Sequence, residues 1–335
     1  MKTKVNLLLG VAMGALFIWL ALRGTDFEGV KASFKAANYL YLIPVVFLSI
    51  IVQIARSYRW GVIVEPLEKI DQGTLFTITS VGFMAITLLP VRMGEIVRPY
   101  LISRKSTIKL GSSLATIVVE RIFDMLTLMI LLLFVLMTVD LPEWVLRAAY
   151  AILLIIIPFL VLLIFLAVKR EISVKGFDRI AGKLPPAFAS RLMKLFHSFL
   201  DGLQILPDWK KTVNLSFLSL FIWCLIALLT YILFSSFASM SELPVAAAFA
   251  VLIITALGVA LPTAPGFIGN YHFSCVVGLT LFGIPKTDAL TFAIVLHFIQ
   301  FSVVLVLGLA CLPFIKVPLS SLFKSGGEIN TTYDT

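Results

Sequence analysis

Long apolar stretches recur along almost the whole chain, and they constrain its fold more than any other feature. They cover residues 5–22, 40–54, 76–89, 110–139, 145–168, 213–240, 243–261, 271–284 and 290–314. Hydrophobic residues make up 60% of the chain and charged residues 13%, whereas soluble domains have roughly 45–50% and about 25%. Because a spanning helix needs about 20 apolar residues, the sequence predicts an all-α polytopic integral membrane protein with about 6–8 transmembrane helices.

One long polar segment divides these stretches into two halves. Residues 169–212 contain nine lysines and arginines, and their apolar residues recur at helical spacing. This pattern predicts an amphipathic helix on the cytoplasmic surface of the membrane. We therefore expect one transmembrane domain over residues 1–320, with a first half over 1–168, a second half over 213–314 and a disordered tail over 321–335.

A charged segment follows a short apolar stretch in the first half, where charge beside a bilayer core is expensive. It begins after Pro90, and the spacing of Arg92, Glu95 and Arg98 puts all three on one face of a helix. The preceding stretch of about 14 apolar residues is too short to span. A re-entrant hairpin over 73–108 is therefore favoured, with a complete crossing as the alternative.

A second broken apolar stretch lies in the other half. The two breaks share leucine, proline and, four residues later, glycine: Leu89-Pro90-x-x-x-Gly94 and Leu261-Pro262-x-x-x-Gly266. Inverted-repeat transporters place such broken helices around a substrate site at mid-membrane. Chance recurrence of a common helix-ending pair is the alternative, and 243–285 can be either a re-entrant hairpin or two spans.

Basic residues also predict the orientation of the chain. If 73–108 enters and leaves on the cytoplasmic side, Arg56 and Arg59 face the cytoplasm together with both termini, as the positive-inside rule requires. Both arginines lie next to Tyr58 and Trp60. This mixture of basic and aromatic residues is interpreted as the interfacial end of the second span.

Three more charged residues, Glu120, Arg121 and Asp124, lie inside a long apolar stretch. Each costs about 2.5–3.5 kcal/mol at a helix centre on insertion scales. Glu120 and Asp124 share a helix face, and Arg121 reaches Asp124 at i,i+3. One interpretation is an ion-pair cluster that fixes this helix to the charged hairpin through Arg92 or Arg98. The other, compatible with it, is that an arginine holds an anionic headgroup, whose phosphate suits a planar guanidinium.

The second break contains residues that end a helix or let backbones approach closely. They are Pro262, Pro265, Gly266 and Gly269. Free N–H groups at the broken helix ends would form an anion site, with Asn270 and His272 beside it. For His272, a hydrogen-bonded packing role is the alternative.

The sequence contains no motif for a nucleotide, a metal or a catalytic triad. Its three cysteines and three histidines are scattered, and the net charge of +9 comes mainly from loops. We therefore expect no cofactor, no metal ion, no catalytic residue and no nucleic-acid partner.

Three motifs, in this order, resemble the lysylphosphatidylglycerol synthase transmembrane (flippase-like) family. They are Pro90-x-Arg92-x-Gly94-Glu95-x-x-Arg98, Glu120-Arg121-x-x-Asp124 and Pro262-x-x-Pro265-Gly266-x-x-Gly269. The resemblance covers nearly the whole chain, without the soluble aminoacyl-transferase domain of bifunctional members. It implies a prokaryotic inner-membrane protein that moves or presents aminoacylated phosphatidylglycerol or isoprenoid-type lipids. The family often has glycine and glutamate where this chain has Phe267 and His272, so an acidic role is not carried over to His272.

These features together predict a lipid flippase-like transporter. An anionic or phosphate-bearing headgroup would enter a polar cavity between the two hairpins, where arginines would hold it and acids would position them. A membrane-embedded transferase acting on a lipid-linked sugar or phosphate is the first alternative, and a scaffold of a lipid-synthesis complex is the second. The expected partners are membrane lipids with anionic headgroups, while a homo-oligomer or a lipid-biosynthesis partner stays open.

Overall fold

The computed structural model consists of helices and their connections throughout the residues that it describes. These are residues 2–89, 94–140, 142–181, 185–202, 208–260 and 264–315. The longer helices are α1 (Lys2–Leu22), α2 (Phe27–Ala36), α3 (Leu42–Val64), α4 (Gln72–Leu88), α5 (Val97–Lys105), α6 (Leu110–Thr138), α7 (Glu143–Val168), α8 (Arg170–Ala181), α9 (Pro186–Gly202), α10 (Trp209–Phe234), α11 (Val245–Ala260), α12 (Asn270–Thr280) and α13 (Lys286–Cys311). Short 3-10 turns are η1 (Tyr39–Tyr41), η3 (Ala238–Met240), η4 (Pro265–Phe267) and η5 (Leu312–Phe314).

Several helices have the length and composition needed to cross a bilayer. Three described segments qualify alone: Tyr39–Val64, Trp209–Phe234 and Lys286–Phe314. The bent pair Leu153–Leu166 and Arg170–Arg179 qualifies as a fourth, and shorter apolar helices cover Ala12–Leu22, Gln72–Leu88 and Val245–Ala260. The prediction of an all-α membrane protein is confirmed, while the number of 6–8 crossings stays a prediction.

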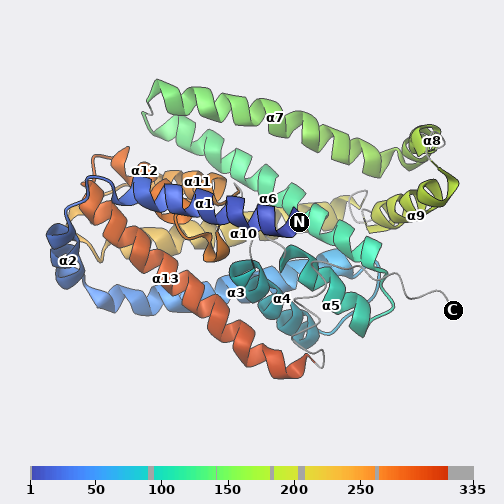
Figure 1. The fold of residues 1–335 in the computed structure, drawn as a ribbon, viewed down its shortest axis with the longest axis horizontal. Helices are drawn as coiled ribbons and strands as arrows, with labels where there is room; N and C mark the ends of the chain where they lie inside the picture. Colours follow the sequence, from blue (N-terminus) through green and yellow to red (C-terminus); the bar gives the residue numbers. More distant parts are fainter. Residues whose placement is uncertain are drawn as a thin grey trace.

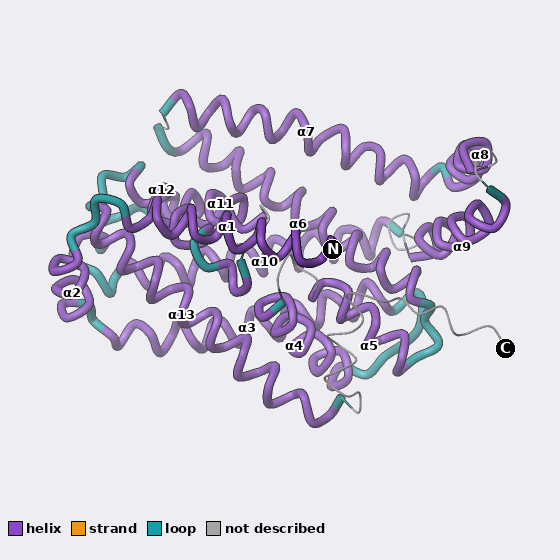
Figure 2. The backbone as a smooth tube through the Cα atoms, viewed as in Figure 1, coloured by secondary structure: helices purple, strands orange, loops and turns teal. Residues whose placement is uncertain are grey.

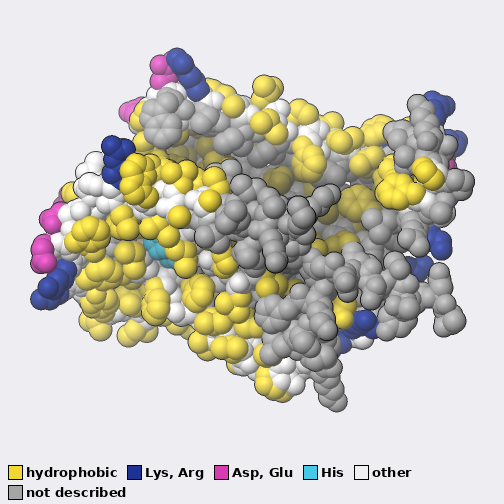
Figure 3. Space-filling view, in the orientation of Figure 1, with side chains coloured by type: hydrophobic (Ala, Val, Ile, Leu, Met, Phe, Trp, Pro, Cys, Tyr) yellow, Lys and Arg dark blue, Asp and Glu magenta, His cyan; other side chains and the backbone are white. Residues whose placement is uncertain are grey.

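The surface agrees with a membrane environment. In Figure 1 the long helices run across the view, with α6 and α7 as an antiparallel pair along the upper edge. Most connections lie at the two ends of this bundle or at the lower end of α13 (Figure 2). Charged side chains gather at the same two ends, while hydrophobic side chains cover much of the flank between them (Figure 3). Exposed apolar side chains such as Phe47, Leu154 and Phe217 are suited to contact with lipid.

The polar segment 169–212 contains two helices, α8 and α9, where the sequence suggested one. The C-terminal part of α9 packs against protein, because Leu200 is buried in a cluster with Phe123 of α6 and Ile63 of α3, whereas Phe188 near its N-terminus is exposed. Its apolar spacing is thus used for contact with α6 and α3, which sequence spacing alone does not distinguish from contact with lipid. The domain boundaries and the tail 321–335 stay predictions, and the tail lies outside the described residues.

Each broken segment forms two helices that pack against each other. In the first, α4 ends before Leu89 and α5 returns alongside it. Gly94 makes this possible, because a Cβ there would lie 2.1 Å from the backbone nitrogen of Ile86. In the second, α11 packs on α12, and a Cβ at Gly258 would lie 1.7 Å from the hydroxyl of Ser274. The sequence located both breaks; whether either segment is re-entrant stays a prediction.

Candidate functional site

The site is built on α6, whose apolar sequence carries charged side chains on adjacent turns. Glu120 and Asp124 are buried, whereas the side chain of Arg121 is 33% exposed. Arg121 contacts both acids: Nη2 lies 3.1 Å from Glu120 Oε1, and Nη1 lies 3.2 Å from Asp124 Oδ2. The ion pair between Arg121 and Asp124, predicted from their spacing, is therefore present.

Arg98 fixes the first hairpin to α6. Its Nη1 and Nη2 donate to the two carboxylate oxygens of Glu120 at 3.1 and 2.7 Å. Its guanidinium carbon lies 4.6 Å from the ring centroid of Trp60. The side chain crosses α4 at Gly82, where a Cβ would lie 2.1 Å from Arg98 Cγ. A bidentate pair at 1% exposure holds α5 in one register against α6.

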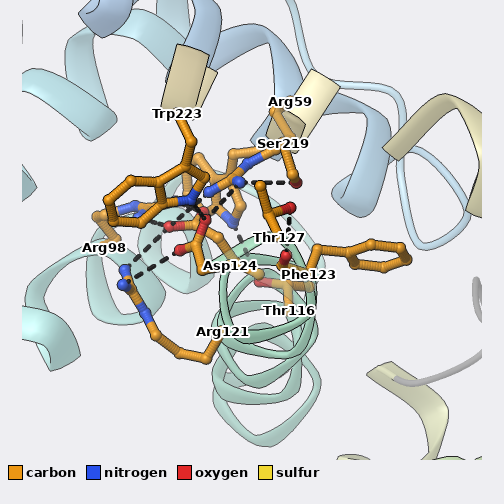
Figure 4. A network of polar contacts seen from close by, with 11 residues as sticks. Arg59, Arg98, Thr116, Arg121, Phe123, Asp124, Thr127, Ser219 and Trp223 are labelled. Atoms are coloured by element: carbon orange, nitrogen blue, oxygen red, sulfur yellow. Dashed lines mark hydrogen bonds and ion pairs between the residues drawn. The ribbon is translucent and has the colours of Figure 1, made fainter. Parts of the chain in front are cut away.

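Arg59 of α3 makes the second connection to α6. Its Nη1 donates to Asp124 Oδ1 at 2.7 Å and to the hydroxyl of Ser219 on α10 at 2.8 Å. Its Nη2 lies 3.5 Å from Glu120 Oε1. The indole N–H of Trp223 also donates to Asp124 Oδ1, at 3.0 Å. Four helices therefore meet at two carboxylates, and Figure 4 shows these side chains converging on Asp124.

The buried network has an excess of positive charge. Three arginines, Arg59, Arg98 and Arg121, face the two carboxylates of Glu120 and Asp124. Buried charges are tolerated when they are paired with good geometry, and an unbalanced charge is costly in a low dielectric. Among the described residues, Glu95 in the wall of an adjacent cavity adds one negative charge near Arg121 and Arg56 of the same wall adds one positive charge, so the cavity and the network together keep one positive charge in excess.

A cavity of about 260 Å³ lies next to the network. Its wall includes residues of α3, α4, α6, α10, α11, α12 and α13, so both halves of the chain contribute. Most of the wall is apolar. The polar and charged lining residues are Ser49, Gln53, Arg56, Thr87, Glu95, Arg121, Thr230, Thr255, Tyr271, His297 and Gln300.

The structure separates the predicted site residues into two groups. Glu95 and Arg121 line the cavity, whereas Arg98, Glu120 and Asp124 lie behind it in the ion-pair network. Arg92 and Pro262 were also predicted and lie outside the described residues. The proposed pairing of the acids with the charged hairpin is present through Arg98.

The residues predicted around the second break make local contacts. Asn270 Nδ2 donates to the carbonyl of Gly258 at 3.3 Å, and His272 Nδ1 accepts from the backbone N–H of Gly269 at 3.5 Å. Gly269 has φ +96°, and a Cβ there would lie 2.4 Å from the carbonyl oxygen of Gly14. Pro265 and Gly266 form the turn η4. These contacts support the packing alternative for His272. Among residues 264–272, Phe267 and Tyr271 line the cavity.

Sequence reasoning missed the contribution of α3. Arg56 and Arg59 were interpreted as the interfacial end of the second span, and this was wrong: α3 continues to Val64, and Arg59 is 2% exposed. The missed signal is that Gln53, Arg56 and Arg59 recur at three-residue steps, like the charged residues that follow Pro90.

Comparison with known proteins identifies the family. The family model described as the lysylphosphatidylglycerol synthase TM region matches residues 7–308. The chain belongs to this family. A UPF0104 membrane protein of Methanothermobacter thermautotrophicus is 23% identical over 331 residues, which cover 94% of this chain and 96% of the relative. The UPF0104 membrane protein MJ1595 of Methanocaldococcus jannaschii is 22% identical, with the same coverage of each chain. This family membership and the spanning helices make the chain an integral membrane protein.

Proposed function

We propose that this protein is a lipid flippase-like transporter for an anionic or phosphate-bearing lipid. The headgroup would pass through the cavity between the two broken segments, while the acyl or prenyl tails stay in the bilayer. Membrane lipids with anionic headgroups are the partners that this proposal requires. The finding that supports it most is one cavity lined by both broken segments and adjoining a buried network with excess positive charge.

The residue roles follow from the contacts. Arg59 and Arg98 already donate to carboxylates at 2.7 Å, so they act as positioning residues. Arg121 pairs with the same acids and also lines the cavity, where a headgroup phosphate can share its guanidinium. We place the termini and the basic helices α8 and α9 on the cytoplasmic side of a prokaryotic inner membrane, because basic loops stay inside.

We favour transport over a transferase reaction because Glu120 and Asp124 are held in ion pairs with arginines. General acid–base catalysis needs a carboxylate that can exchange a proton with the substrate. Both acids also lie outside the cavity wall. They are therefore better suited to holding arginines in place.

A lipid-movement assay tests the proposal. Purified protein is reconstituted in liposomes with labelled phosphatidylglycerol, and a membrane-impermeant quencher reports the label that reaches the outer leaflet. We expect faster movement than in protein-free liposomes and a loss of at least about fivefold in Arg121→Gln, because a charge-assisted contact is removed. Arg147→Gln, at the exposed Glu143 pair, is the matched control.

Two results would contradict transport. The first is movement at the protein-free rate by folded protein. The second is turnover of a lipid-linked donor with a soluble acceptor in the same liposomes without lipid movement, which would replace transport with a transferase.

A further inference from the structure

Three side chains that line the cavity have unused polar groups. Gln53 of α3 and Thr255 of α11 have buried polar atoms without a hydrogen-bond partner among the described residues, and Arg56 of α3 forms no ion pair there. The Nε of Arg121 also lacks a partner, but both of its Nη atoms lie within 3.2 Å of carboxylate oxygens. Other lining hydroxyls are already used within their own helices: Ser49 donates to the carbonyl of Val45, and Thr230 to that of Ile226. The unused groups therefore form a distinct set within the cavity wall.

Gln53 is the most informative of the three. It is 1% exposed, and neither its amide oxygen nor its amide nitrogen has a hydrogen-bond partner within the described part of the chain. A buried polar group without a partner is destabilising, and such groups need an explanation in a folded protein. The hydroxyl of Thr255 on α11, which is also buried and lines the same cavity, has no hydrogen-bond partner among the described residues either. A ligand with acceptor oxygens would accept hydrogen bonds from the amide nitrogen of Gln53 and from the hydroxyl of Thr255, while the amide oxygen of Gln53 needs a donor such as a headgroup hydroxyl.

Arg56 adds positive charge one helical turn from Gln53. Its guanidinium carbon lies 4.7 Å from the ring centroid of Phe83, a cation–π contact that leaves the in-plane N–H groups available. Arg59, Arg98 and Arg121 each pair with a carboxylate, whereas Arg56 forms no such pair among the described residues. Arg56 is therefore the cavity arginine best placed to bind a ligand.

The charges around the cavity indicate the charge of that ligand. The described residues of the cavity and the network contribute four arginines and three carboxylates, which leaves one positive charge in excess. They are Arg56, Arg59, Arg98, Arg121, Glu95, Glu120 and Asp124. A negatively charged group with several acceptor oxygens suits this excess among the described residues, and a phosphodiester has both properties.

We propose that Gln53, Arg56 and Thr255 form a binding subsite for a singly charged phosphodiester, of the kind that joins a phospholipid headgroup to its glycerol. The subsite rests on the proposed function because it lies in the cavity proposed for transport, but ligand binding can be tested separately from lipid movement. A soluble phosphate offers the same oxygen acceptors, so the test must compare the two sources.

The test measures ligand binding to the full-length protein in detergent by native mass spectrometry and by thermal shift. The probes are phosphatidylglycerol, zwitterionic phosphatidylcholine and inorganic phosphate. We expect preference for phosphatidylglycerol, because the choline of phosphatidylcholine offsets the charge of its phosphodiester. The affinity for phosphatidylglycerol should fall about tenfold or more in Arg56→Met and by less in Gln53→Leu and Thr255→Val. Arg56→Lys keeps the charge and should retain more affinity than Arg56→Met. Thr291→Val is the matched control, since that buried hydroxyl bonds to the carbonyl of Thr287 away from the cavity.

Three results would overturn the subsite. The first is an unchanged affinity for phosphatidylglycerol in folded Arg56→Met. The second is an equal loss of that affinity in Thr255→Val and Thr291→Val. The third is a thermal stabilisation by inorganic phosphate as large as that by phosphatidylglycerol. Failure of binding and failure of transport are distinguishable. If Arg56→Met weakens the binding of phosphatidylglycerol but labelled lipid does not move, the subsite is supported and transport is contradicted. If labelled lipid moves equally fast in Arg56→Met, transport is supported and the subsite is contradicted.

Discussion

The hairpin of α4 and α5 and the hairpin of α11 and α12 both contribute to the wall of one cavity, but different interactions hold them. The first is tied to α6 by the buried pair of Arg98 with Glu120. The second is held by close backbone contact, with Gly269 against the carbonyl of Gly14 and Asn270 on the carbonyl of Gly258. The two hairpins thus share a sequence pattern at the break, but an ion pair stabilises the first and close contacts at small residues stabilise the second.

This difference gives the cavity an asymmetric wall. The first half supplies Arg56, Glu95 and Arg121, whereas the second half supplies hydroxyl, amide and aromatic groups such as Thr255, Gln300 and Tyr271. A headgroup would therefore meet its charged contacts on one side and neutral ones on the other. Stability measurements can test whether the two hairpins really depend on different forces.

The largest effect is expected for Glu120→Gln. Glu120 is the shared partner of Arg59, Arg98 and Arg121, so its loss leaves three buried or half-buried arginines facing one acid. We expect a loss of about 3–5 kcal/mol in the free energy of unfolding, measured in detergent or bicelles. Arg98→Met should cost less than Glu120→Gln, because Glu120 would keep its other two partners.

The exposed pair of Glu143 and Arg147 provides the control. Glu143→Gln should change the free energy of unfolding by no more than about 0.5 kcal/mol. A larger loss in Arg98→Met than in Glu120→Gln would contradict the view that Glu120 is the common partner of the network.

A smaller effect is expected at the second hairpin, where Gly269→Ala tests close packing. The substitution places an L residue at φ +96° and a Cβ 2.4 Å from the carbonyl oxygen of Gly14. Gly24 provides the comparison, since it has φ +71° and no heavy atom within 4 Å of an added Cβ. Gly24→Ala should cost about 1–2 kcal/mol for a positive φ. Gly269→Ala should cost about 1–3 kcal/mol more, because its Cβ overlaps Gly14 and its ψ of −69° lies outside the left-handed helical region. If thermal denaturation shows that Gly269→Ala and Gly24→Ala lose the same free energy of unfolding, α1 moves aside at no cost.

Much of the architecture could be predicted because apolar length and helix-breaking residues are local properties of a sequence. The positions of both breaks and the pairing of the charged hairpin with α6 followed from spacing and from the cost of buried charge. The role of Arg59 could not be derived in this way. Its burial depends on Asp124, 65 residues away, and on Ser219, 160 residues away.

The polar groups of the cavity without a hydrogen-bond partner also could not be predicted from the sequence. Gln53 and Thr255 are unremarkable in sequence, since a single amide or hydroxyl in an apolar helix usually bonds within its own helix or to a neighbour. Only the assembled structure shows that both line the cavity without a protein partner among the described residues. His272 gives the opposite case, because its place beside a break suggested a ligand, and its imidazole accepts from the backbone N–H of Gly269.

The smallest effect concerns Phe267, which has φ +57° in a region that favours glycine. Phe267→Gly and Phe267→Ala both remove the ring, so the difference between them isolates the backbone preference. We expect Phe267→Gly to be more stable than Phe267→Ala by about 1 kcal/mol, because only alanine keeps the left-handed strain. At Phe83, inside α4, the same pair should give the opposite order, with alanine favoured by about 1 kcal/mol. If alanine is also favoured at position 267, the turn relaxes without its phenylalanine, and the second hairpin depends on this side chain as well as on its glycines.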